Sequence, residues 1–95
     1  MNFLNLFGGN SAKSELKNAL DAGQIKIHQK DGDIHLLQIR GASEIPLGIW
    51  SKDFRDRMTL NGASLHLRED YPAFAALNPT EQANILISLS KEEKT

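Results

Sequence analysis

Two β-rich runs flank the dipeptide Asp31-Gly32 within residues 24–40, and this arrangement constrains the fold more than any other stretch of the chain. Asp-Gly between such runs is a strong signal for a β-hairpin with a two-residue turn. Apolar and polar residues alternate before the turn, as they do in a strand with one solvated face. The sequence therefore predicts an antiparallel hairpin here.

The run after the turn is apolar on both faces. Ile34 and Leu36 point one way, and Leu37 and Ile39 point the other way. A strand of this kind is typical of the middle of a sheet, where both faces are covered. We therefore expect a third strand beside residues 34–39 and packing on both faces of the sheet.

Length and composition bound the class of protein. A chain of 95 residues makes one domain. Its 11 basic and 12 acidic residues leave a net charge of −1, which provides no overall attraction for nucleic acid or acidic membranes. The absence of cysteine excludes disulfides, thiolate catalysis and cysteine-bound metals. With no long apolar run and no signal-like start, the expected location is cytoplasmic.

Two helices are indicated by their end signals. Ser11 is the expected cap of a helix over 11–22, and Gly23 is suited to the left-handed residue that ends it. Asn78 is the expected cap of a helix over 79–90, with Pro79 at its first position. The faces expected to pack on the sheet carry Ala12, Leu16, Ala19 and Leu20 in the first helix and Gln82, Ile85, Leu86 and Leu89 in the second.

The middle of the chain is less distinctive. Residues 41–48 are expected to form a loop that lies across the edge of the core. Residues 51–60 are interpreted as a helix, because Trp50, Phe54 and Met58 recur every four residues. The alternative is a strand, with Asn61-Gly62 as a second hairpin turn.

A short strand over 64–68 and a short helical piece over 73–77 complete the expected elements. Together they predict an α+β fold, with a small, mostly antiparallel sheet of at least three strands and two to three helices packed against it.

Residues 1–10 form an apolar N-terminal arm, in which Gly8-Gly9 is expected to uncouple the apolar residues from the helix that follows. Residues 11–90 would then form a single α+β domain, and 91–95 a frayed polar tail. The arm carries no charged side chain, whereas interfacial membrane helices usually carry Lys or Arg, so protein contact is favoured. The competing interpretation is an edge strand of the chain's own sheet. The expected partner-binding residues are Phe3, Leu4, Leu6 and Phe7.

The three histidines are the candidate ligands of a metal site. A two-residue turn places His28 opposite His35, and a strand over 64–68 on the other edge of the central strand would add His66. Three imidazoles are the ligand set of a catalytic zinc site. Two observations argue against a metal: no carboxylate is placed to orient the imidazoles, and a three-residue turn would separate His28 from His35. We therefore expect a surface histidine pair that binds no metal.

No catalytic motif occurs in the chain: it has no glycine-rich phosphate loop, nucleophile elbow, HExxH or calcium loop. We therefore expect no enzyme activity, no catalytic residue and no cofactor. The expected function is a small protein–protein interaction module that binds a partner or a second copy, as a homodimer, through the arm or a sheet edge. The first alternative is metal or small-ligand binding at the histidine face. The second is weak nucleic-acid binding, disfavoured by interleaved charges and few exposed aromatics.

Overall fold

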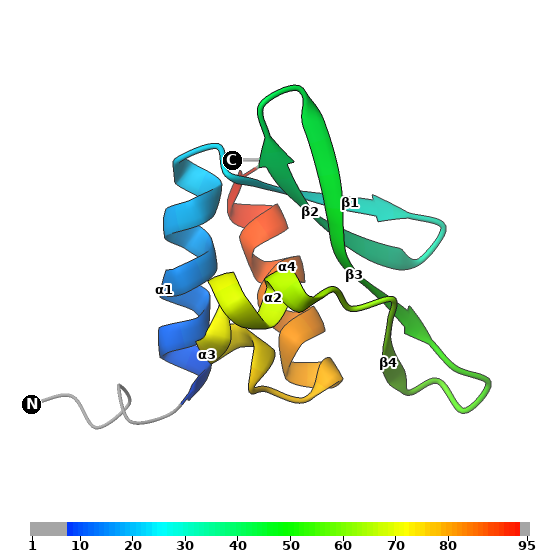
Figure 1. Cartoon of the computed structure of the whole chain (residues 1–95). Helices are drawn as coiled ribbons and strands as arrows, with labels where there is room; N and C mark the ends of the chain where they lie inside the picture. The colour runs from blue at the N-terminus through cyan, green and yellow to red at the C-terminus, as the bar shows by residue number, and fades with distance from the viewer. Residues whose placement is uncertain (1–7, 94–95) are drawn as a thin grey trace, which may run out of the picture.

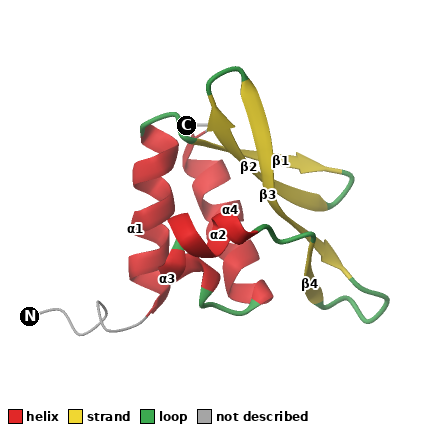
Figure 2. Cartoon of the chain, in the orientation of Figure 1, coloured by secondary structure: helices red, strands yellow, loops and turns green. Residues whose placement is uncertain are grey.

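The computed structural model describes residues 8–93, which form a four-stranded antiparallel sheet in the order β1-β2-β3-β4, with helices packed on it. The helices gather on one side of the sheet (Figures 1 and 2). This is the predicted α+β class. The elements are α1 (Gly8–Asp21), β1 (Ile25–Lys30), β2 (Asp33–Arg40), β3 (Ser43–Lys52), β4 (Met58–Asn61), α2 (Leu65–Asp70), α3 (Pro72–Ala75) and α4 (Pro79–Glu93).

The predicted hairpin is present, with the predicted turn. Asp31 and Gly32 have φ values of 52° and 86°, and two consecutive positive φ values are the mark of a type I′ turn. The turn sets the register so that His28 lies opposite His35. The two-residue turn, rather than the three-residue alternative, is therefore correct.

The central position of β2 is also confirmed, but its third-strand neighbour was missed. Residues 43–52 form β3, paired with β2, where a loop over 41–48 was predicted. Pro46 suggested a loop, because proline cannot donate a hydrogen bond within a sheet. In the structure Pro46 pairs with Leu37 beside a register shift between Leu36 and Leu37, and an irregularity of this kind accommodates a proline.

The helix predicted over 51–60 is wrong. The alternative strand is present as β4, but Asn61-Gly62 is not a hairpin turn, because the helix α2 follows it and not a strand. β3 runs to Lys52, the loop lies at 53–57, and β4 follows. The Asp53 side chain organises this loop, because its Oδ1 accepts the backbone N–H groups of Arg55 at 2.8 Å and Arg57 at 2.9 Å. Phe54 is 90% exposed at the tip, so its four-residue spacing from Trp50 and Met58 did not reflect a helix face.

The strand predicted over 64–68 is the helix α2. Leu67 is buried, whereas Leu65 is 69% exposed, so the two leucines do not share the inward face that alternation would give them. The short helical piece predicted over 73–77 is present as α3, at residues 72–75.

The first helix begins at Gly8, three residues before the predicted cap Ser11. Gly8-Gly9 therefore lies in the first turn and does not separate the arm from the helix. Glycine destabilises a helix chiefly in its interior, where fixing its backbone costs the most entropy, so it is tolerated in the first turn. The predicted end is correct, because Gly23 has a φ of 74° and the Gln24 N–H donates to the Ala19 carbonyl at 2.8 Å.

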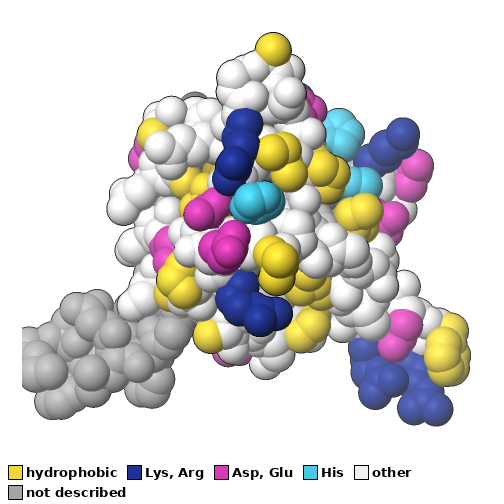
Figure 3. Space-filling model, in the orientation of Figure 1, with side chains coloured by type: hydrophobic (Ala, Val, Ile, Leu, Met, Phe, Trp, Pro, Cys, Tyr) yellow, Lys and Arg dark blue, Asp and Glu magenta, His cyan; other side chains and the backbone are white. Residues whose placement is uncertain are grey.

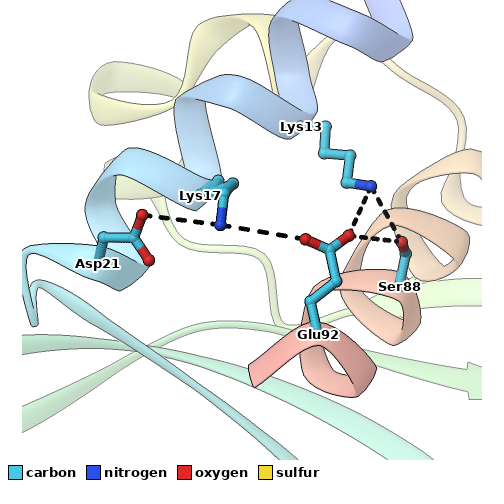
Figure 4. Close-up of polar contacts among 5 residues, drawn as sticks. All are labelled: Lys13, Lys17, Asp21, Ser88 and Glu92. Atoms are coloured by element: carbon cyan, nitrogen blue, oxygen red, sulfur yellow. Dashed lines mark hydrogen bonds and ion pairs between the residues drawn. The ribbon is translucent and has the colours of Figure 1, made fainter. Parts of the chain in front are cut away.

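The last helix starts at its predicted cap. Asn78 Oδ1 accepts the N–H of Glu81 at 2.9 Å. The helix continues to Glu93, beyond the predicted end at 90, and a side chain of α1 contacts its last turn. Lys13 Nζ contacts a carboxylate oxygen of Glu92 at 2.8 Å and donates to Ser88 Oγ at 3.1 Å (Figure 4). The hydrogen bond from Lys13 lowers the pKa of Glu92.

The core lies between the helices and the inner face of the sheet. Trp50 on β3 is fully buried, and its indole Nε1–H donates to Gln82 Oε1 at 3.0 Å. Gln82 on α4 in turn donates from Nε2 to the Phe74 carbonyl at 2.9 Å. The rings of Trp50 and Phe74 meet edge to face at 5.7 Å between centroids. One polar side chain thus links β3, α3 and α4 at the centre of the core.

The outer face of the sheet is not covered by any described element, which corrects the prediction of packing on both faces. Strand pairing places one set of side chains on this face, and none of them is buried. Cross-strand neighbours shield the apolar members instead, so three of them are half-buried without a covering layer. The apolar residues of the outer face are Leu37, Ile39, Pro46 and Ile49.

The fold predicts a large cost for Leu36→Ala and a small one for Leu65→Ala. Leu36 is 0% exposed in the middle of the central strand, so its truncation leaves a cavity and should lower the free energy of unfolding by about 2–5 kcal/mol. Leu65 is 69% exposed, and its truncation should change that free energy by less than about 0.5 kcal/mol. Urea denaturation of both variants provides the measurement. Equal losses would contradict the assigned core.

Candidate functional site

A polar cluster lies at the C-terminal end of α2, where this helix meets β2. Gln38 is nearly buried on the inner face of β2, and its Nε2 donates to Asp70 Oδ2 at 2.8 Å. The Nε of Arg40 donates to Gln38 Oε1 at 2.8 Å, and a guanidinium nitrogen of Arg40 lies 3.6 Å from Asp70. The Gln38 amide therefore lies between Asp70 and Arg40, and both its nitrogen and its oxygen have a hydrogen-bond partner.

His66 extends this cluster along α2. Its Nδ1 lies 3.4 Å from a guanidinium nitrogen of Arg40 and 3.5 Å from a carboxylate oxygen of Glu69. Basic, acidic and histidine side chains accordingly gather over α2, with hydrophobic side chains beside them (Figure 3). The charges are paired and half exposed, so each pair contributes little to stability.

Tyr71 and the cluster line an open cavity of about 320 Å³. Burial raises the pKa of the Tyr71 hydroxyl, and the neighbouring Asp70 carboxylate acts in the same direction, whereas a hydrogen bond with Gln38 acts against them. The phenol therefore stays protonated at neutral pH. The cavity offers hydrogen-bonding groups that already bind one another.

A pocket of about 210 Å³ with a lining that is about equally polar and apolar lies beside the N-terminal half of α2, between this helix, α3 and β4. Leucine and alanine side chains form most of its wall, and Leu65 is exposed at its mouth. Ser64 is the residue just before α2, yet its side chain does not cap the helix. The pocket is lined by Leu60, Ala63, Ser64, Leu65, Leu67, Arg68 and Ala75, and we refer to it as the α2 pocket.

Two polar groups of the α2 pocket have no partner within the described part of the chain. The Ser64 Oγ is buried without a hydrogen bond. A buried hydroxyl without a partner is uncommon, because losing its hydration costs free energy. Arg68 is exposed and forms no ion pair with any residue between 8 and 93. The pocket thus combines an apolar wall with a hydroxyl and a guanidinium that are available to a ligand.

The sequence-predicted partner-binding residues Phe3, Leu4, Leu6 and Phe7 lie outside the described residues. Their assignment stays a prediction.

The histidines fall into two places rather than one. His28 and His35 face each other on the outer side of the sheet, as predicted, with ring centroids 6.2 Å apart. His66 lies on α2, which packs on the inner side, so three convergent imidazoles are not formed. Among residues 8–93, no group of three histidine, cysteine or acidic side chains is close enough to hold a metal ion.

Several basic residues of the described chain lie beside acidic or aromatic side chains. Lys26 lies 3.6 Å from Glu44, and Arg57 lies 3.4 Å from Asp53. Arg55 lies over the ring of the exposed Phe54, with its guanidinium carbon 5.3 Å from the centroid. Interleaved acids offset the positive charge that a phosphate backbone would require.

Sequence reasoning missed both sites on α2, although one signal was present. Gln38 follows Ile34 and Leu36 at every second position, so a polar residue was aligned with the core face. Such a residue needs a buried partner. The α2 pocket had no comparable signal, because residues 64–68 also fit a short strand.

Comparison with protein-family models, with curated proteins and with solved structures finds no match to this chain. Within the described residues, no helix combines the length and apolar character needed to cross a membrane.

The polar cluster predicts that the hydroxyl of Tyr71, the single tyrosine of the chain, loses its proton only at strongly alkaline pH. Because the native pKa of Tyr71 is raised, the phenolate should appear only above the ordinary value of about 10. The stabilisation linked to this proton is complete below the unfolded pKa and is lost as the pH rises through the native pKa. Phenolate absorbance at high pH measures the midpoint directly, since the chain has one tyrosine. Asp70→Asn should lower the midpoint, and an unchanged midpoint in that variant would exclude the proposed contribution of Asp70.

Proposed function

We propose that this chain is a small non-enzymatic protein-interaction module that self-associates, with Phe3, Leu4, Leu6 and Phe7 as its partner-binding residues. The observation that supports this proposal most is the α2 pocket, where Leu65 is 69% exposed beside an unpartnered hydroxyl. Exposed apolar surface next to a concave site is typical of protein-binding surfaces. The cytoplasm remains the proposed location, on the composition of the chain.

A non-enzymatic role fits the polar cluster. The groups of Gln38, Arg40 and Asp70 bind one another at hydrogen-bonding or ion-pairing distance. A general base or nucleophile needs a free lone pair directed at a substrate. The paired groups are better suited to joining α2 to the sheet.

The free edge of β1 offers a second route for association. β1 pairs with β2 on one side and has no described strand on the other. Lys26, His28 and Lys30 alternate along it, and charged edge residues discourage pairing between identical strands. The edge is therefore less suited to a second copy than the arm, whose residues carry no charge.

Deleting residues 2–7 tests the proposed role of the arm. We expect the full chain to sediment as a dimer and the truncated chain as a monomer, with melting temperatures within a few degrees of each other. Phe54→Ser is the matched control, because it removes an exposed aromatic side chain elsewhere. This variant should still sediment as a dimer. A truncated chain that keeps the mass of the full chain but melts much lower would show that the arm folds on its own domain, against the proposal.

A further inference from the structure

We propose that His28 and His35, which face each other across β1 and β2, form a binding site for a divalent transition-metal ion of the zinc type. Imidazole nitrogen is a preferred ligand of zinc, copper and nickel, and the chain has no cysteine that would offer a softer ligand. The site uses neither the N-terminal arm nor the α2 pocket, so this inference does not rest on the proposed function.

The hairpin register holds the two imidazoles at a spacing that one metal ion can bridge. Their ring centroids are 6.2 Å apart, and the ring planes meet at 71°. A zinc ion about 2.0–2.1 Å from one nitrogen of each ring would place the centroids roughly 5–6 Å apart. His28 is exposed, so a small rotation of its side chain is enough to reach this spacing.

Neither ring has another partner that would compete with a metal. Within the described residues, His28 and His35 form no hydrogen bond or ion pair, and their ring contact is with each other. A neutral imidazole carries a lone pair on one nitrogen, and this nitrogen can bind a metal. His66 differs from the pair, because its Nδ1 lies 3.4 Å from a guanidinium nitrogen of Arg40 and 3.5 Å from a carboxylate oxygen of Glu69.

The outer face of the sheet gives an ion direct access to the pair. No described element covers this face, and His28 lies on the edge strand β1. On the other side of the pair, Ile49 of β3 lies opposite His35. An ion would therefore enter from solvent and lie beside an apolar side chain, and apolar neighbours restrict the access of water to a metal site.

The charges around the pair balance one another, so they give no net repulsion of a cation. Residues two positions apart in a strand share a face, which places Lys26 and Lys30 on either side of His28. Lys26 lies 3.6 Å from Glu44, and Lys30 lies opposite Asp33.

The structure removes one objection to a metal at this pair. A three-residue turn would separate the histidines, but Asp31 and Gly32 form a two-residue turn that sets them opposite each other. A third ligand is not supplied within residues 8–93, where no group of three histidine, cysteine or acidic side chains is close enough to hold a metal. Water would fill the remaining positions of the ion, and the site would bind zinc more weakly than a closed structural site does.

Titration of the full chain with zinc chloride at neutral pH, followed by isothermal calorimetry, tests the site. We expect one zinc ion per chain. His28→Ala and His35→Ala should each weaken binding at least about tenfold, because losing even an outer partner of a ligand costs about 10–100-fold. His66→Ala is the matched control, because it removes a histidine from α2 and should keep the affinity of the unaltered chain. Magnesium chloride should not bind, because Mg²⁺ prefers oxygen ligands.

A second measurement separates loss of the ligands from loss of the fold. Zinc should raise the melting temperature of the full chain and of His66→Ala, because an ion that binds the native state stabilises it. It should leave the melting temperatures of His28→Gln and His35→Gln unchanged. Both glutamine variants keep a polar side chain on the open face, so without zinc they should melt within a few degrees of the full chain.

Three results would overturn the inference: no saturable zinc binding, unchanged affinity in either variant of the pair, or an equal loss in His66→Ala, which would place the ion on α2. Deleting residues 2–7 should leave the zinc affinity unchanged. A loss of zinc binding on that deletion would place a ligand of the ion in the arm and overturn the two-histidine site. The mass of the truncated chain tests the proposed function separately.

Discussion

The hydrogen bonds of Gln82 hold the two layers of this fold in one arrangement. Its amide accepts the Trp50 indole N–H from the sheet and donates to the Phe74 carbonyl in α3, so neither buried polar group is left without a partner. Apolar packing alone would allow the helices to slide over the sheet, since it is not directional. A satisfied polar link inside the core sets the position of α4 relative to β3 and α3.

α2 divides the surface that this arrangement creates into two chemically different regions. At its C-terminal end, Gln38 and Asp70 join the helix to β2 through a short hydrogen bond. At its N-terminal half, Leu65 and the Ser64 hydroxyl, which has no partner among residues 8–93, belong to the α2 pocket. The polar groups of the first region bind one another, whereas the Ser64 hydroxyl of the second has no partner among the described residues. This difference explains why the α2 pocket, rather than the larger polar cavity, supports the proposed interaction.

The parts of the fold that local chemistry specifies could be predicted from the sequence, and the parts that depend on distant residues could not. The turn at Asp31-Gly32, the end of α1 at Gly23 and the Asn78 cap all follow from neighbouring residues. The loop organised by Asp53 also depends on neighbouring residues. Its sequence nevertheless shows the four-residue spacing of a helix, so a helix was predicted where the Asp53 side chain binds the backbone of a loop. The arm residues, predicted as the partner-binding site, lie outside the described part of the chain and remain a prediction.

The sequence by itself determined the α+β class and the central strand, because strand alternation acts over a few residues. It left the pairing of His28 with His35 open between a two-residue and a three-residue turn, and the structure decided for the two-residue turn. Only the tertiary structure decided that residues 65–70 are helical and that the outer sheet face is open in the described chain. It also decided that His66 joins Arg40 rather than the other histidines. A six-residue helix is too short to be stable alone, so its conformation and its pocket arise from packing against β3 and α3.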